Sequence, residues 1–149
     1  MNRVWTYVIS RPLTGEQLKQ LKAGGDSFVA SWSAHENKLA ASFDILKEKI
    51  LLVKVNEDVH GASGCSIDKL TRFVKETEAG FGIELLNRFV VAYKLGENIE
   101  TTQASHIKEL LAQQVITENT IVYNTAAANE EELARWEQPL KDTWLARYL

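Results

Sequence analysis

Gly61-Ala62-Ser63-Gly64-Cys65-Ser66-Ile67-Asp68 joins the most apolar run of the chain, residues 50–55, to an amphipathic segment. Glycine and other small residues let the backbone turn tightly and approach another group closely. The first amides of a helix are unpaired and carry partial positive charge, so they favour an anion or a thiolate. This stretch therefore predicts a strand, a turn and a helix, and its loop is the first candidate for a functional site.

Hydrophobic periodicity on both sides of this stretch predicts the core of the fold. Alternating residues predict strands at 4–10, 39–45, 50–55 and 87–95, with 50–55 at the centre of a sheet. Thr14 and Gln17 form a plausible capping box that opens a helix to about Ala34. Gly24-Gly25 either allows a close contact between this helix and the sheet or breaks the helix so that Asp26 or Ser27 caps a second one, and the continuous apolar stripe favours one helix. A second helix is expected at 66–79.

The order of these elements is strand, helix, strand, strand, helix, strand. It predicts an α+β fold, a ferredoxin-like βαββαβ antiparallel sheet with both helices on one face. Residues 98–149 are expected to add an α-rich extension to this core of residues 1–97, within a single domain of residues 1–149. In the extension, Thr101 or Thr102 is expected to cap a helix, 120–123 can be a strand, and Pro139 fits the first turn of a last helix.

Composition narrows the possible partners and location. A length of 149 residues fits one domain, and a net charge of −3 with scattered Lys and Arg disfavours a nucleic-acid binder. No apolar run is long enough for a membrane helix, so no membrane partner is expected. The first residues lack the apolar region of a signal peptide, and one cysteine cannot form an internal disulfide. These features favour a cytoplasmic location.

Chain direction through the predicted sheet brings the turn at His35 and the loop at 61–65 to the same end of the molecule. Cys65 near a helix N-terminus can have a lowered pKa, and His35 or His60 can serve as its base, which would support nucleophilic or redox chemistry. Alternatively Cys65 is a small apolar residue packed under the helix start. Asp68, in the first helical turn, opposes thiolate formation and counts against the nucleophile.

The same loop can instead bind an anionic ligand through backbone amides and hydroxyl groups. Phosphate-binding glycine motifs are absent, and the three histidines and one cysteine lack paired ligand spacing, so neither a cofactor nor a metal is expected. The candidate catalytic residues are Cys65 and His35. The candidate ligand-binding residues are His60, Ser63, Gly64, Ser66 and Trp32.

Several short runs resemble a family of small proteins from Bacteroidetes bacteria, and the resemblance covers almost the whole chain. The runs are Trp32-x-x-His35, Ser42-Phe43, Gly64-Cys65-Ser66-Ile67-Asp68, Asn119-Thr120-Ile121-Val122 and Trp144-x-x-Arg147-Tyr148-Leu149. Many members carry the label "ABC transporter ATPase", but this chain has no Walker lysine and no signature motif. The resemblance implies no catalytic residues, and it places Trp32, His35, Cys65 and Asp68 among the characteristic positions of the family.

The sequence thus predicts a small cytoplasmic binding or regulatory module for an anionic ligand or a protein partner, with its site at the His35 and Gly61–Cys65 end. One alternative is a Cys65-dependent enzyme or thiol switch, with His35 or His60 as the base. Another is a structural protein that forms oligomers, such as a homodimer, through the exposed face of its sheet.

Overall fold

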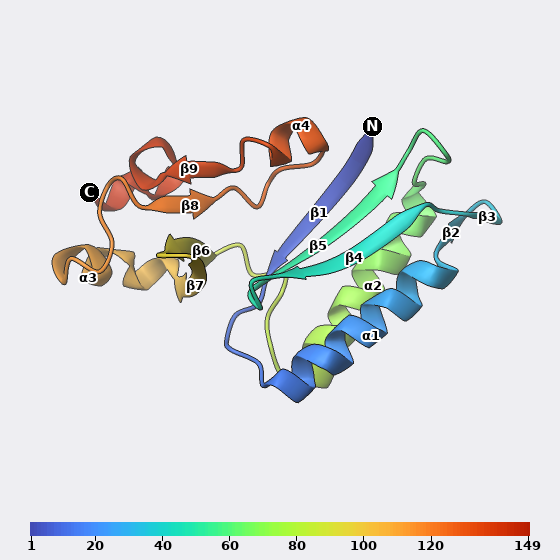
Figure 1. Cartoon of the computed structure of the whole chain (residues 1–149), viewed down its shortest axis with the longest axis horizontal. Helices are drawn as coiled ribbons and strands as arrows, with labels where there is room; N and C mark the ends of the chain where they lie inside the picture. Colours follow the sequence, from blue (N-terminus) through green and yellow to red (C-terminus); the bar gives the residue numbers. More distant parts are fainter.

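The computed structural model describes the whole chain, Met1 to Leu149, as an α+β protein with two antiparallel sheets (Figure 1). The first sheet has the order β1-β5-β4, with bounds β1 (Asn2–Val8), β4 (Ala41–Leu46) and β5 (Ile50–Asn56). The second has the order β7-β6-β8-β9, with bounds β6 (Val90–Leu95), β7 (Asn98–Gln103), β8 (Ile121–Tyr123) and β9 (Glu137–Pro139). A small hairpin is formed by β2 (Ser33–Ala34) and β3 (Asn37–Lys38).

Two long helices, α1 (Gly15–Ser31) and α2 (Gly64–Phe81), lie side by side along the first sheet, on the side away from the second sheet (Figure 1). The predicted capping box at the start of α1 is confirmed, because Gln17 N donates to Thr14 Oγ1 at 3.1 Å and Thr14 N donates to Gln17 Oε1 at 3.0 Å. Gly82 follows the last residue of α2 and caps it, with a φ of 63°, the left-handed conformation that glycine adopts readily. No helix of the protein combines the length and the apolar character that crossing a bilayer requires.

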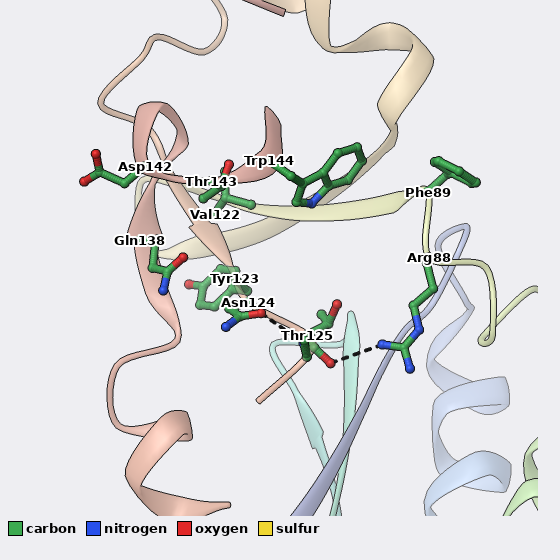
Figure 2. Close-up of a pocket in the computed structure, with 11 residues that line it drawn as sticks. Arg88, Phe89, Val122, Tyr123, Asn124, Thr125, Gln138, Asp142, Thr143 and Trp144 are labelled. Atoms are coloured by element: carbon green, nitrogen blue, oxygen red, sulfur yellow. Dashed lines mark hydrogen bonds between the residues drawn. The ribbon is translucent and has the colours of Figure 1, made fainter. Parts of the chain in front are cut away.

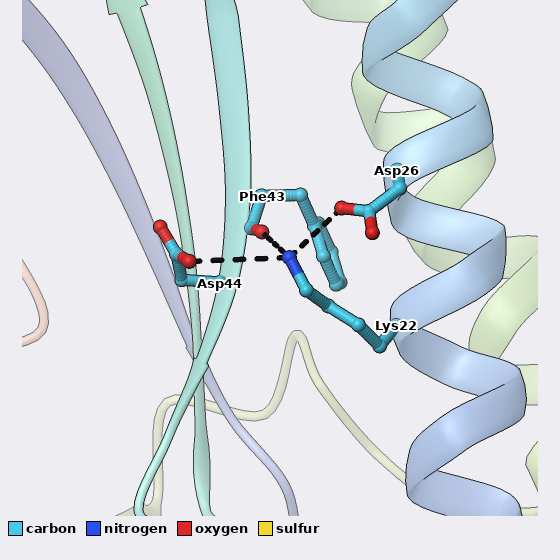
Figure 3. A network of polar contacts seen from close by, with 4 residues as sticks. All are labelled: Lys22, Asp26, Phe43 and Asp44. Atoms are coloured by element: carbon cyan, nitrogen blue, oxygen red, sulfur yellow. Dashed lines mark hydrogen bonds and ion pairs between the residues drawn. The ribbon is translucent and has the colours of Figure 1, made fainter.

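Helix α1 continues unbroken through Gly24-Gly25, as the apolar stripe predicts. Gly25 is buried, and a Cβ atom at this position would overlap the ring of Phe43 on β4. Lys22, one turn earlier, donates from Nζ to the Phe43 carbonyl oxygen at 2.6 Å and to Asp26 at 2.8 Å, with Asp44 at 3.9 Å (Figure 3). Helix and edge strand are therefore joined by close packing and by one shared cation.

The main core lies between these helices and the first sheet. Central strand β5 contributes Leu51, Val53 and Val55, and α2 contributes Leu70 and Val74, all nearly inaccessible to solvent. The prediction that 50–55 is the central strand is confirmed by its pairing with β1 on one side and β4 on the other.

The fourth predicted strand departs from the expected topology. In a ferredoxin-like sheet it would pair with the free edge of β1, but β6 pairs with β7 and β8 in the second sheet. The order β1-β5-β4 therefore matches only the first three strands of that arrangement, and the complete ferredoxin-like topology is not confirmed.

The C-terminal part of the chain differs from the α-rich extension that the sequence predicts. Thr101 and Thr102 lie within strand β7, so the prediction that one of them caps a helix is wrong, and Pro139 ends strand β9. The helices here are short: α3 (Ile107–Ala112), α4 (Glu130–Leu133), and 3₁₀ segments at Ala104–His106, Leu140–Asp142 and Trp144–Tyr148. The predicted strand at 120–123 is present as β8.

The second sheet covers part of the remaining face of the first. Val8 and Ile50 pack against Val90, Ala92 and Tyr123 in a cluster of buried residues from both sheets. Because residues of the same chain cover this face, the reason for expecting a dimer through it is weaker.

The segment between β8 and α4 also contacts β1, along its outer edge. Val4 N donates to the carbonyl oxygen of Ala128 at 3.0 Å, and Thr6 Oγ1 donates to that of Thr125 at 3.1 Å. One end of this edge is therefore already paired by a distant part of the chain.

Candidate functional site

The loop that the sequence singles out is held by its own hydrogen bonds. Ser63 Oγ accepts from Ser66 N at 3.2 Å, and Ser66 Oγ accepts from Ser63 N at 2.8 Å. Ser66 is 1% exposed and donates its hydroxyl proton to the Ser63 carbonyl oxygen at 2.7 Å. Both hydroxyl groups are thus engaged in starting α2.

Trp32 lies beside this helix start, as the chain direction predicts. It is 2% exposed, and its indole Nε1 donates to the Ser66 carbonyl oxygen at 2.8 Å. Its ring packs against Trp5 and Phe28, with ring centroids 5.8 Å and 5.2 Å away. This environment makes Trp32 a core residue that joins the end of α1 to the start of α2.

Cys65 is exposed and forms no disulfide. His35 lies in the exposed β2–β3 turn with a φ of 51°, and the side chains of His35 and His60 form no hydrogen bond with the thiol. Five cavities lie elsewhere on the protein, and Cys65, His35, His60 and Gly64 line none of them. Thiol chemistry at Cys65 therefore stays a prediction. No group of three His, Cys, Asp or Glu side chains is placed to hold a metal ion.

A groove of about 600 Å³ lies along the outer edge of β1, and we call it the edge groove. Residues 3–7 of β1 line one side of it, Thr71 of α2 and Leu86 line another, and residues 125–128 close it. It lies at the edge that a fourth strand would fill in a ferredoxin-like sheet. Because β6 belongs to the second sheet, a hollow remains there.

Two arginines, Arg3 and Arg88, supply all the formal charge of the edge groove, because no Asp or Glu lines it. Arg88 donates from Nη1 to the Thr125 carbonyl oxygen at 3.4 Å, and the guanidinium of Arg3 lies 5.1 Å from the ring centre of Trp5. Neither arginine forms an ion pair. Tyr7 lines the groove as well, and burial raises its pKa to about 12 although the Arg88 charge lowers it in part.

Arg88 also lines a second cavity of about 470 Å³, the seam cavity, which is bordered by β8, β9 and the C-terminal 3₁₀ helix (Figure 2). Phe89 and Trp144 form an edge-to-face pair at its rim, with ring centroids 6.3 Å apart, and are 63% and 48% exposed. Asp142 lies at the opposite side of the cavity from Arg88 (Figure 2). The seam cavity is therefore aromatic and of mixed charge, whereas the edge groove is cationic.

Sequence reasoning did not single out the edge groove. Its residues come from β1, α2, the segment before β6 and the segment before α4, so no short motif contains them. No signal in the sequence marks Arg3 or Arg88, since both look like ordinary surface cations until the tertiary structure brings them together.

No protein-family model matches the chain, and neither a curated protein nor a solved structure matches it. The resemblance to the family of small Bacteroidetes proteins stays a prediction.

Proposed function

We propose that the protein is a small binding module that takes an anionic ligand in the edge groove, with Arg88 as the residue that holds the anion. The observation that carries this proposal is the lining of the groove, which contains two arginines without ion-pair partners and no acidic residue. The function class is the one that the sequence favours, a ligand-binding module, but the site is at a different place.

The chemistry of the groove suits a carboxylate or a phosphate. A guanidinium group is planar and always charged, and it can donate two parallel hydrogen bonds to such a group. Arg88 has only the neutral Thr125 carbonyl oxygen as a partner, so its other donors are available to a ligand. Trp5 and the small side chains of residues 126–128 leave an apolar space beside the cation for the body of the ligand.

The proposal is tested by replacing Arg88 with glutamine and titrating simple anions. We expect benzoate and inorganic phosphate to shift the NMR resonances of Tyr7 and Arg88 in the unmodified protein. Arg88→Gln should weaken this binding by about tenfold or more, because a hydrogen bond to a charged group contributes about 1.5–3 kcal/mol. Arg72→Gln is the matched control, since Arg72 is exposed on α2 and lines neither the edge groove nor the seam cavity. Equal affinities in the two variants would contradict the proposal.

A further inference from the structure

We infer that the ligand of the edge groove carries two anionic groups on one elongated chain, with Arg3 binding one group and Arg88 the other. This inference rests on the proposed function, and it adds the chemical class of the ligand. Free linear dicarboxylates and peptides with two acidic side chains share this chemistry.

The two arginines lie toward opposite ends of the groove. Arg3 also lines a cavity with Met1 and Asn129, beyond one end. Arg88 also lines a small cavity with Val8 and Thr125, beyond the other end. The guanidinium of Arg3 lies over Trp5, and Trp5 and Tyr7 point to the same face of β1 about 7 Å apart. A ligand that reaches both cations must therefore span roughly 10 Å, about three residues of extended chain.

Charge in the groove favours two anions over one. A single monoanion at Arg88 would leave Arg3 without a carboxylate partner. Glu130, the acidic residue that follows the 125–128 wall, is already engaged, because its Oε1 accepts from Asn2 Nδ2 at 2.6 Å and lies 3.7 Å from Lys54 Nζ. Glu57 and Asp58 line the cavity beyond the Arg3 end, but Glu57 Oε2 accepts from Ala62 N at 3.0 Å and Asp58 pairs with the N-terminal ammonium at 2.7 Å. Neither carboxylate forms an ion pair with Arg3.

The middle of the groove determines the spacer between the two anionic groups. Between the two arginines, the apolar side chains of Trp5, Leu86, Ala126 and Ala127 line the groove together with the hydroxyl-bearing Thr6, Thr71 and Thr125. An apolar spacer would gain from contact with the apolar part of this surface, whereas a positively charged spacer would lose hydration without an acidic partner. The ligand class is therefore a chain of methylene groups, or of small residues, between two acidic groups.

The experiment uses the linear dicarboxylates from succinate to dodecanedioate, with hexanoate as the monoanionic probe, and calorimetry or NMR titration to measure affinity. We expect affinity to pass through a maximum with chain length and to exceed that of hexanoate by about tenfold or more. For the dicarboxylate that binds most tightly, Arg3→Gln and Arg88→Gln should each lower the affinity by about tenfold. For hexanoate, only one of the two substitutions should lower the affinity. Arg72→Gln should leave both ligand types unaffected, and Arg3→Lys should retain part of the dicarboxylate binding.

A second arm distinguishes the two sources of the ligand. A peptide with blocked ends, acetyl-Glu-Ala-Glu-amide, presents two carboxylates on one face of an extended backbone, and its Gln-for-Glu version presents none. Tighter binding of the peptide than of any free dicarboxylate would identify a peptide ligand, and the reverse order would identify a small molecule. Either result supports the inference.

The same titrations distinguish a failure of the inference from a failure of the proposed function. If dicarboxylates of every length bind no better than hexanoate, while Arg88→Gln still weakens hexanoate, the inference is overturned and the proposed function stands. If no anion binds more tightly to the unmodified protein than to Arg88→Gln, both are overturned. A urea unfolding curve for each variant verifies that the fold is intact.

Discussion

Gly25 shows how a single hydrogen atom can determine the packing of a helix on a sheet. The ring of Phe43 occupies the space in which any other residue would place its Cβ atom, whereas the neighbouring Gly24 has open space there. An alanine in a helix is normally more stable than glycine by about 1 kcal/mol. At Gly25 this gain competes with overpacking of a buried ring, which typically costs about 1–3 kcal/mol.

We therefore expect opposite effects from two adjacent substitutions. Gly24→Ala should raise the free energy of unfolding in urea by about 0.5–1 kcal/mol. Gly25→Ala should lower it by up to about 2 kcal/mol, the overpacking cost less the gain in helix propensity, because the ring of Phe43 is buried against α1 and α2 residues. A stabilising effect at both positions would show that Phe43 can move aside at little cost.

Ionisation of one residue, Tyr7, should make the free energy of unfolding depend on pH. Burial raises its pKa from 10.0 to about 12, and the Arg88 charge offsets part of this effect. Because the folded pKa lies above the ordinary one, the contribution of neutral Tyr7 to stability is complete below about pH 10 and is lost as the pH rises through about 12. We expect unfolding free energies across this range to fall less steeply in Tyr7→Phe than in the unmodified protein. Identical slopes would mean that Tyr7 ionises freely.

Among the elements, α1 and β4 are held together by Lys22 as well as by Phe43 (Figure 3). The ammonium group donates to the Phe43 carbonyl oxygen at 2.6 Å and to Asp26 at 2.8 Å, and its side chain is 45% exposed. Hydrogen bonds of a charged donor contribute about 1.5–3 kcal/mol when protected and less when solvated. Lys22→Met should therefore cost about 1 kcal/mol in urea unfolding. Lys19→Met, at an exposed lysine of the same helix without a partner, should change stability little; an equal loss would contradict the role of Lys22.

Periodicity and capping residues predicted the elements of the first sheet because their signals are local. The Thr14–Gln17 capping box and the apolar run at 50–55 both correspond to the structure. The partner of β6 was not predicted, because Leu95 pairs with Asn98 across a two-residue turn in which Gly96 has a φ of 62°. Such a hairpin closes a far shorter loop than a return to β1 would. Thr102, interpreted as a helix cap, is instead a β-branched residue of the second strand of this hairpin.

At the scale of the whole molecule, this one difference in pairing gives rise to the edge groove. Four segments surround the groove, and local signals in the sequence predict only whether each one is a strand, a helix or a loop. These segments come together through contacts between residues that are far apart in the chain. The sequence could therefore predict the segments around the groove but not the groove that they form. The loop at 61–65, which carried a local signal, is in the structure a helix start secured by Ser63 and Ser66.

The two sheets should unfold together, because the chain crosses between them and Val8 and Ile50 share a buried cluster with Val90 and Tyr123. A variant with Trp136→Phe and Trp144→Phe keeps only Trp5 and Trp32, so its fluorescence reports the first sheet, whereas far-UV circular dichroism reports the whole chain. We expect the two urea transitions of this variant to coincide, as they do in two-state unfolding. A fluorescence midpoint that differs from the circular dichroism midpoint would show that the first sheet with α1 and α2 is an independent unit. In that case the edge groove would open before the protein unfolds completely, because its wall at residues 125–128 is not part of that unit.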